Sequence, residues 1–138
     1  MSATGDPAAG FTLLETLTAL AVAALAGAIA FPMLDKAISA AVLAQSRAEV
    51  RSDLAAARAE AMRTDAPVEF AVAADGAGYG WRAADAHHLP SSARLQGPEA
   101  PLVFYADGSA RASMLTLSVG PRKAELTVMA TGVVADAP

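Results

Sequence analysis

An apolar run near the N-terminus constrains this chain more than any other feature. The run extends over 24 residues from Phe11 to Leu34, and Glu15 is its only ionisable side chain. At about 1.5 Å per residue, such a helix measures roughly 36 Å, which exceeds the hydrocarbon thickness of a bilayer. We therefore expect a transmembrane helix over residues 11–34. A carboxylate in such a segment is costly unless it is solvated or paired, so Glu15 is a candidate functional residue.

Length, charge and composition limit what the rest of the chain can be. The 138 residues leave about a hundred after the apolar run, enough for one small domain. The net charge is −4, and all ten Lys and Arg residues follow Leu34 without forming the basic stripe typical of nucleic-acid binding. The absence of cysteine excludes a disulfide framework, a thiolate nucleophile and a zinc-thiolate site. We expect no nucleic-acid partner.

The N-terminal segment is open to three interpretations. A secretory signal cleaved after Ala30 is suggested by the A-x-A pattern in "AIAF", but residues 1–10 lack the basic residue of such signals. A permanent membrane anchor fits the length, although it gives Glu15 no role. The third interpretation treats the stretch from Gly10 through Phe11 to Glu15 as one unit.

That unit carries a resemblance to a known family. The stretch "GFTLLETLTALAVAALAGAIAFP" resembles the class III signal of type IV pilins and type II secretion pseudopilins, in which a cleaved Gly-Phe junction precedes a glutamate at the fifth mature position. The resemblance implies that residues 1–10 are a leader ending at Gly10, and that a prepilin peptidase exposes Phe11 and methylates its amine. It also implies that Pro32 bends the helix, and that Glu15 pairs with the terminal amine of a neighbouring subunit.

The physical chemistry of such a pair supports an assembly role. Cleavage before Phe11 creates an α-amino group that is largely protonated at neutral pH, four residues from Glu15. A carboxylate near a helix N-terminus is favoured by the helix dipole, and a charge pair is far stronger in low dielectric than in water. An intersubunit pair would therefore fix the axial register between packed helices.

The helix is expected to continue over residues 35–66. This segment is rich in Ala, Arg and Glu and contains neither Gly nor Pro before Pro67, which ends the helix. One face is apolar, and it consists of Leu43, Val50, Leu54, Ala57 and Ala61. The opposite face is expected to carry Glu49, Asp53 and Glu60.

Residues 67–138 are expected to form a β-rich domain. Apolar residues alternate with polar ones over 68–72, 115–119 and 126–130, which predicts half-buried strands. Turns are indicated by the glycine-rich segment 74–80, by Asp107-Gly108 and by Gly120-Pro121. Residues 84–100, with two prolines, are interpreted as a loop.

This order predicts an α+β fold, in which the long N-terminal helix packs its second half on an antiparallel β-sheet. The segments "LVFYADGSAR" and "LTVMATGVV" resemble the F-x-x-D-G-S and terminal T-G segments of H-type minor pseudopilins and related minor pilins. The resemblance implies a pilin-like, single-pass protein of the bacterial inner membrane, with its C-terminal domain in the periplasm. Implied partners are a prepilin peptidase, other minor pseudopilins and the major pseudopilin.

We find little in the sequence that indicates catalysis, a metal or another cofactor. His87-His88 is interpreted as a solvated loop pair, because no third ligand occurs at a familiar spacing. Asp75, Asp85 and Asp107 lie in turn-like sequence without the spacing of a calcium loop.

We therefore predict a non-enzymatic minor pseudopilin near the tip of a type II secretion pseudopilus, aiding the export of folded proteins. Two alternatives remain open. One is a minor type IV pilin that serves pilus assembly or DNA uptake, and the other is a secreted domain released after Ala30.

Overall fold

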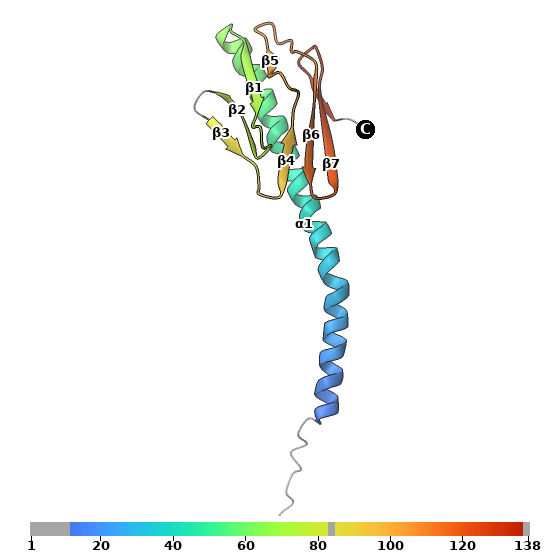
Figure 1. Ribbon diagram of the computed structural model, residues 1–138. Coiled ribbons are helices and arrows are strands. Elements are labelled where there is room, and N and C mark those ends of the chain that lie inside the picture. Colours follow the sequence, from blue (N-terminus) through green and yellow to red (C-terminus); the bar gives the residue numbers. More distant parts are fainter. Residues whose placement is uncertain (1–11, 83–84, 137–138) are drawn as a thin grey trace, which may run out of the picture. The chain divides into compact units, whose positions relative to one another are not determined.

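The computed structural model describes residues 12–82 and 85–136. One long helix, α1 (Leu13–Thr64), precedes all the strands of the described chain (Figure 1). The strands are β1 (Val68–Val72), β2 (Gly78–Arg82), β3 (Asp85–His88), β4 (Ala93–Gln96), β5 (Leu102–Phe104), β6 (Ser113–Val119), β7 (Arg122–Val128) and β8 (Val134–Asp136). The chain divides into two compact units, the first ending at Lys36 and the second beginning at Ala37.

Helix α1 ends in a specific backbone motif. Asp65 adopts a left-handed conformation with φ of 52°, and the Ala66 amide donates to the carbonyl of Ala61 at 3.3 Å. This six-residue hydrogen bond is that of a Schellman motif, which satisfies a carbonyl of the last turn. Pro67 follows and cannot extend the helix. The predicted helix end is therefore confirmed to within two residues.

The predicted apolar face of α1 is confirmed within the second unit. Val50, Leu54, Ala57 and Ala61 are fully buried, and Leu43 packs at the edge of the core. The predicted polar face is only partly correct: Glu49 is exposed, whereas Asp53 and Glu60 are partly buried. Asp53 directly precedes Leu54, so it lies at the border of the buried face and reaches the strands.

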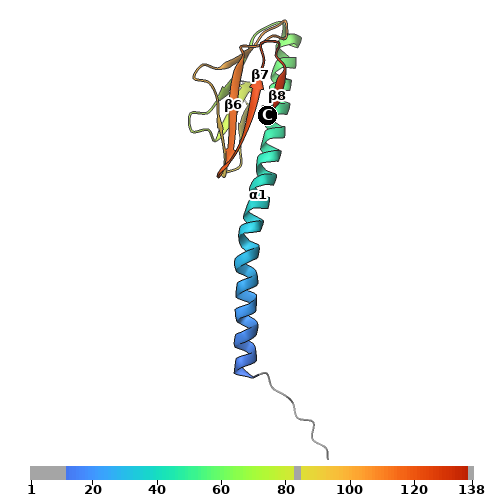
Figure 2. The same cartoon turned by 90° about the vertical axis from the view of Figure 1, so that its right-hand side faces the viewer.

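Two four-stranded antiparallel sheets pack in the second unit, in place of the single predicted sheet. Their strand orders are β3-β2-β1-β5 and β4-β6-β7-β8. The split arises because β1 pairs with β5, through Val68 opposite Phe104, rather than with a strand of the second sheet. Figure 2 shows β6, β7 and β8 alongside the C-terminal half of α1.

The prediction of a loop over residues 84–100 is wrong. The segment contains β3 and β4, which are only four residues long each. Tyr79 of β2 stands opposite His87 of β3, and β4 pairs with β6 with Leu95 opposite Leu117. Strands this short carry too little periodicity to be recognised locally, and their pairing with distant strands defines them.

The core lies between α1 and the two sheets. Its largest fully buried side chains are Phe70, Phe104, Leu54, Leu95, Leu102, Leu115, Leu117 and Leu126. The β6–β7 hairpin closes at Gly120-Pro121, as predicted, and Gly120 has the positive φ of 55° that such a tight turn requires. The alternation predicted to reach Ala130 stops at Val128, because the chain turns there and Ala130 is exposed.

Candidate functional site

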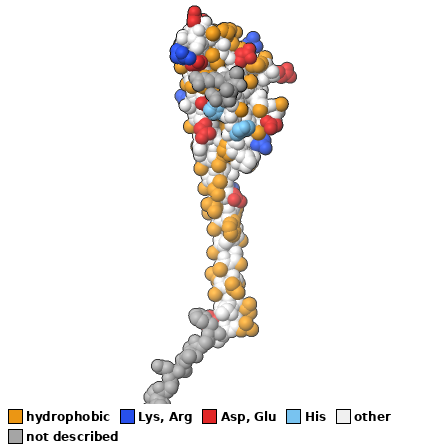
Figure 3. All heavy atoms as spheres, turned by 90° about the vertical axis from the view of Figure 1, so that its left-hand side faces the viewer, with side chains coloured by type: hydrophobic (Ala, Val, Ile, Leu, Met, Phe, Trp, Pro, Cys, Tyr) orange, Lys and Arg blue, Asp and Glu red, His pale blue; other side chains and the backbone are white. Residues whose placement is uncertain are grey.

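The N-terminal half of α1 presents a continuous apolar surface. In Figure 3 hydrophobic side chains follow this part of the helix. Its large side chains, each more than half exposed, are Leu13, Leu14, Leu17, Leu20, Val22, Leu25, Ile29, Phe31, Met33, Leu34 and Ile38. This is the one helix of the described chain long and apolar enough to cross a membrane, with a mean hydropathy of 2.1. Because none of that window is buried, the segment is not a core helix and is compatible with a single-pass membrane anchor.

Glu15 lies in the first turn of α1. Its backbone amide donates to the hydroxyl of Thr12 at 3.2 Å and to the carbonyl of Thr12 at 3.0 Å. Thr12 is therefore the N-cap of the helix. The Thr-x-x-Glu spacing is that of a capping box, so the cap could have been found from the sequence.

The Glu15 side chain is exposed and forms no ion pair with any residue of the described ranges. A free carboxylate at the positive end of a helix dipole, surrounded by apolar side chains, is suited to bind a cation from another molecule. The predicted cleavage and methylation residues, Gly10 and Phe11, lie outside the described residues.

Pro32 lies inside α1, and the helix continues on both sides of it. Proline has no amide hydrogen, so the carbonyl of Ala28, four residues earlier, loses its intrahelical partner. The bend at Pro32 stays a prediction.

Arg58 binds two distant turns at once. From α1 its Nε donates to the carbonyl of Gly108 at 2.8 Å, and its Nη2 donates to the carbonyl of Thr131 at 3.2 Å. The two turns contain the Asp107-Gly108 and Thr131-Gly132 pairs singled out in the sequence. The two segments that carry the resemblance therefore meet on one helical side chain. We call this arrangement the Arg58 clasp.

Each turn of the clasp has its own hydrogen bonds. The Asp107 carboxylate accepts from the amide of Ser109 at 2.9 Å and from its hydroxyl at 2.6 Å, and these bonds lower the pKa of Asp107. In the second turn, the Gly132 amide donates to Met129 at 2.9 Å. Both glycines have positive φ, 79° at Gly108 and 74° at Gly132.

The close approach of the two turns explains why residue 132 is a glycine. A Cβ atom on Gly132 would overlap the carbonyl oxygen of Gly108 and lie 2.6 Å from Arg58 Nε. The motifs indicated tight turns but gave no sign that Arg58 joins them, because its partners are 50 and 73 residues away.

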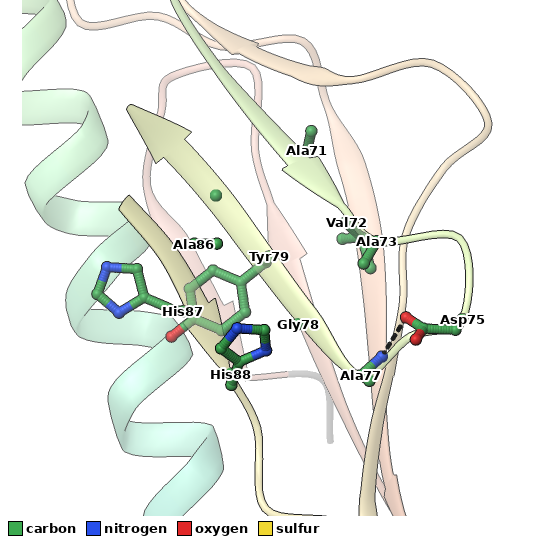
Figure 4. A pocket seen from close by; sticks show the side chains of 11 residues that line it. Ala71, Val72, Ala73, Asp75, Ala77, Gly78, Tyr79, Ala86, His87 and His88 are labelled. Carbon is green, nitrogen blue, oxygen red and sulfur yellow. Dashed lines mark hydrogen bonds between the residues drawn. The ribbon is translucent and has the colours of Figure 1, made fainter. Parts of the chain in front are cut away.

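A polar cluster joins α1 to the first sheet. Figure 4 shows the two members of this cluster that lie on the sheet, Tyr79 and His87. The Tyr79 hydroxyl donates to the Asp53 carboxylate at 2.6 Å, and His87 Nδ1 lies 3.5 Å from the same carboxylate oxygen. The Tyr79 ring stacks between Phe70 and His87, with centroid separations of 5.1 and 5.4 Å. Burial, together with the hydrogen bond to Asp53, raises the pKa of Tyr79.

The cluster corrects the interpretation of His87-His88 as a loop pair, because both residues lie on strand β3. Consecutive strand residues face opposite ways, so His87 contacts Tyr79 while His88 does not share that stack. Within residues 12–82 and 85–136, no three His, Asp or Glu side chains gather closely enough to hold a metal ion. The arrangement of Asp53, Tyr79 and His87 binds a strand pair to a helix.

A shallow pocket of about 310 Å³ lies on the first sheet beside this cluster. Its lining includes small residues, such as Ala71 of β1, Ala73 after β1, and Gly78 and Gly80 of β2. Tyr79, His87 and His88 also line it, as Figure 4 shows. The Asp75 carboxylate at its border stabilises a turn, since it accepts a hydrogen bond from the Ala77 amide at 2.9 Å. The pocket has no nucleophile with an adjacent base, which acyl or group transfer requires.

Comparisons with known proteins identify the fold. No protein-family model and no curated protein sequence matches the chain. Among solved structures, the chain is similar to the minor pseudopilin EpsH from the type 2 secretion system of Vibrio cholerae, with a TM-score of 0.57 and 14% identity over 69% of this chain and 95% of that one.

It is equally similar to the type IV minor pilin FimU of Pseudomonas aeruginosa, with a TM-score of 0.57 and 16% identity over 70% of this chain and 88% of that one. The chain therefore has the pilin-like α+β fold of these two structural subunits, and the predicted fold class is confirmed.

Proposed function

We propose that this chain is a minor pseudopilin of a type II secretion system, anchored by α1 in the bacterial inner membrane with its second unit in the periplasm. The observation that carries the proposal is an exposed apolar helix with a free carboxylate in its first turn, continuous in sequence with a unit of EpsH-like fold. An exposed apolar surface of this extent marks a membrane or protein–protein interaction site, and a subunit that packs helix against helix requires one.

The mechanism follows from the chemistry of Glu15. A prepilin peptidase would cleave after Gly10 and methylate the new amine at Phe11, leaving a cation near the first turn of α1. That cation and the Glu15 carboxylate of a neighbouring subunit would pair in the low dielectric between packed helices. The apolar side chains supply contact area, and the pair fixes the axial register. The subunit would sit near the pseudopilus tip, between other minor pseudopilins and the major pseudopilin.

The processing step has a direct test. Protein isolated from a host with a prepilin peptidase should lack residues 1–10 and carry one added methyl group by intact mass. The same measurement on a Gly10→Leu variant should show an uncleaved chain. A wild-type mature N-terminus at Phe31 would instead support the secreted-domain alternative, and the proposal would fail.

The pairing step is tested by Glu15→Val. The peptidase acts at the junction of residues 10 and 11, so cleavage should be unchanged while crosslinking to the major pseudopilin falls by at least tenfold. The substitution makes the segment more apolar, so poor membrane insertion cannot explain the loss. Leu17→Val serves as a control that alters the same surface without a charge. Normal crosslinking of fully processed Glu15→Val protein would refute the pairing role.

A minor type IV pilin is the second candidate, favoured by the equal similarity to FimU. Reconstitution separates the two: the pseudopilin should associate with pseudopilins encoded beside it, and the pilin with pilus subunits. The form of this alternative that serves DNA uptake predicts salt-sensitive duplex DNA binding in a gel-shift assay. The second unit carries more acidic than basic residues, so we expect no such binding.

A further inference from the structure

Strand β3 leaves one side of its backbone unpaired. It is the outermost strand of the first sheet, and within the described chain it pairs with β2 alone (Figure 1). The Leu89 amide donates to the carbonyl of Ala77 at 2.9 Å, and in an antiparallel pair every second residue exchanges such bonds with its partner. His87 therefore directs its amide and carbonyl toward β2, whereas Ala86 and His88 direct theirs away from it.

The outward-facing backbone groups of Ala86 and His88 form an open edge. No backbone group of residues 12–82 and 85–136 is bonded to them on this side. Residues 86–88 are all exposed, and they include neither Lys nor Pro, which commonly block the pairing of edge strands. Such an edge can accept an extended segment as an additional strand through main-chain hydrogen bonds.

A pocket of about 290 Å³ lies between α1 and this edge strand. The residues that line it are Glu49, Ser52, Asp53, Tyr79, His87 and His88. The Glu49 carboxylate accepts from Gln45 Nε2 at 2.9 Å, and Asp53 has the Tyr79 hydroxyl at 2.6 Å and His87 Nδ1 at 3.5 Å. We call it the acidic pocket.

The charge of the acidic pocket favours a cation. Neither Glu49 nor Asp53 pairs with a Lys or Arg among the described residues. The two carboxylates are four residues apart on α1, a spacing at which like charges repel. A guanidinium or ammonium group between them would remove this repulsion.

The open edge and the acidic pocket fit the same kind of partner. In a strand added to β3, the residue opposite His87 has its side chain on the same face as His87. That face is turned toward α1, as the His87 ring in Figure 4 shows. The added strand would lie about 4.8 Å from β3, a distance that an Arg or Lys side chain spans. A basic residue opposite His87 can therefore reach the acidic pocket.

A second copy of this chain fits the edge less well. Pairing of β3 with β3 of another copy would bring two acidic pockets together, and like charges placed opposite each other are destabilising. Charge complementarity thus favours a different protein that supplies a basic residue.

We propose that β3 accepts an extended segment of a partner protein as an additional strand, and that Glu49 and Asp53 bind an Arg or Lys of this segment. The main-chain hydrogen bonds supply affinity, and the basic side chain fixes the register. All residues of this surface lie in the second unit, so strand addition does not depend on the membrane role proposed above.

The experiment uses the full chain in nonionic detergent and a synthetic probe. The probe is the acetylated pentapeptide Thr-Val-Arg-Val-Thr with a C-terminal fluorescein, and fluorescence anisotropy at pH 8 measures its binding. We expect saturable binding that is at least tenfold weaker when Leu or Glu replaces the central Arg, because the charged hydrogen bonds are lost. Leu binding as tightly as Arg would overturn the proposal, since the pocket would then not select a cation.

Backbone methylation of the probe tests strand addition. N-methylation of both Val residues removes the amides that would face Ala86 and His88, and it should abolish binding. N-methylation of the central Arg changes an amide that faces away from β3, and it should have little effect. Equal effects of the two modifications would show that the peptide does not bind as a strand.

Variants of the protein test the same two contacts. Glu49→Gln should weaken binding about fivefold, whereas Glu125→Gln removes the same charge from the second sheet and should leave it unchanged. Ala86→Pro removes an amide that faces away from β2, so it should abolish binding and leave the unfolding midpoint followed by Trp81 within a few degrees.

Two further results would contradict the proposal. One is unchanged binding to Glu49→Gln together with unchanged binding to a folded Ala86→Pro protein. The other is a dimer of the wild-type chain that Ala86→Pro dissociates, which would show that a second copy occupies the edge.

Discussion

Gly132→Ala tests whether the Arg58 clasp holds the second unit together. The residue has φ of 74°, and an added Cβ would overlap the carbonyl oxygen of Gly108 and crowd Arg58 Nε at 2.6 Å. Gly120→Ala is the matched control, because Gly120 also has positive φ, 55°, but a Cβ there meets nothing within 4 Å. The two variants share backbone strain and differ in the clasp.

The expected magnitudes follow from these two geometries. An alanine in the left-handed backbone conformation costs about 1–2 kcal/mol, and the lower entropy of the unfolded chain offsets part of this cost. Gly120→Ala should therefore lower the free energy of unfolding by about 1 kcal/mol. In Gly132→Ala the turns must also separate, which breaks at least one hydrogen bond from the Arg58 guanidinium. Such a charged hydrogen bond contributes about 1.5–3 kcal/mol. The free energy of unfolding should therefore fall by about 2.5–4 kcal/mol, a large share of the stability of a small domain.

The assay is denaturant unfolding of the full chain in detergent, followed by the fluorescence of Trp81. Trp81 is the only tryptophan and lies on β2 in the second unit, so its signal reports that unit. Arg58→Ala should reproduce most of the Gly132→Ala effect, and combining the two should cost much less than their sum. If Gly132→Ala and Gly120→Ala unfold at the same denaturant concentration, the clasp contributes nothing beyond backbone strain.

Two further predictions concern buried polar groups on α1 and its contacts. Tyr79→Phe leaves the partly buried Asp53 carboxylate without its 2.6 Å partner, so unfolding should become easier by about 1–2 kcal/mol. Because the folded pKa of Tyr79 is raised, its contribution is complete below the ordinary tyrosine pKa of about 10 and is lost as pH rises above it. Wild-type stability should thus fall more steeply than that of Tyr79→Phe in alkaline titrations; parallel curves would contradict the assignment. Ser46→Ala should raise the free energy of unfolding by about 1 kcal/mol, because the fully buried Ser46 hydroxyl has no hydrogen-bond partner within the described chain and alanine favours the helix. A destabilised Ser46→Ala protein would show that the hydroxyl has a partner.

The sequence predicted α1 well because the evidence for it is local. An uninterrupted apolar run, the spacing of Val50, Leu54, Ala57 and Ala61, and Pro67 as a terminator each act within a few turns. The β6–β7 hairpin was predictable for the same reason, since Gly120-Pro121 separates two alternating segments that pair directly.

What the sequence could not predict depends on contacts between distant residues. Strands β3 and β4 are four residues each, and partners in other strands decide that they are strands. The division into two sheets depends on the choice of β5 as the partner of β1, which no local pattern encodes. Of the candidate site, the Thr12 cap was readable from its spacing to Glu15, whereas Arg58 resembles any surface arginine of a helix.

The short strands also explain why the second half of α1 is needed to stabilise the fold. Strands β5 and β8 have three residues each, too few to be stable by their own ladder hydrogen bonds. Asp136 of β8 forms ion pairs with Arg47 and Arg51 of α1. Arg58 donates hydrogen bonds both to the turn after β5 and to the turn before β8. These three arginines, at spacings of four and seven residues, lie along one side of α1. They contact the short strand β8 and the turns beside β5 and β8. A force that pulls the helix away from the sheets must break these bonds together. The same helix that we propose packs against its neighbours through Glu15 therefore also holds the second unit in its folded form.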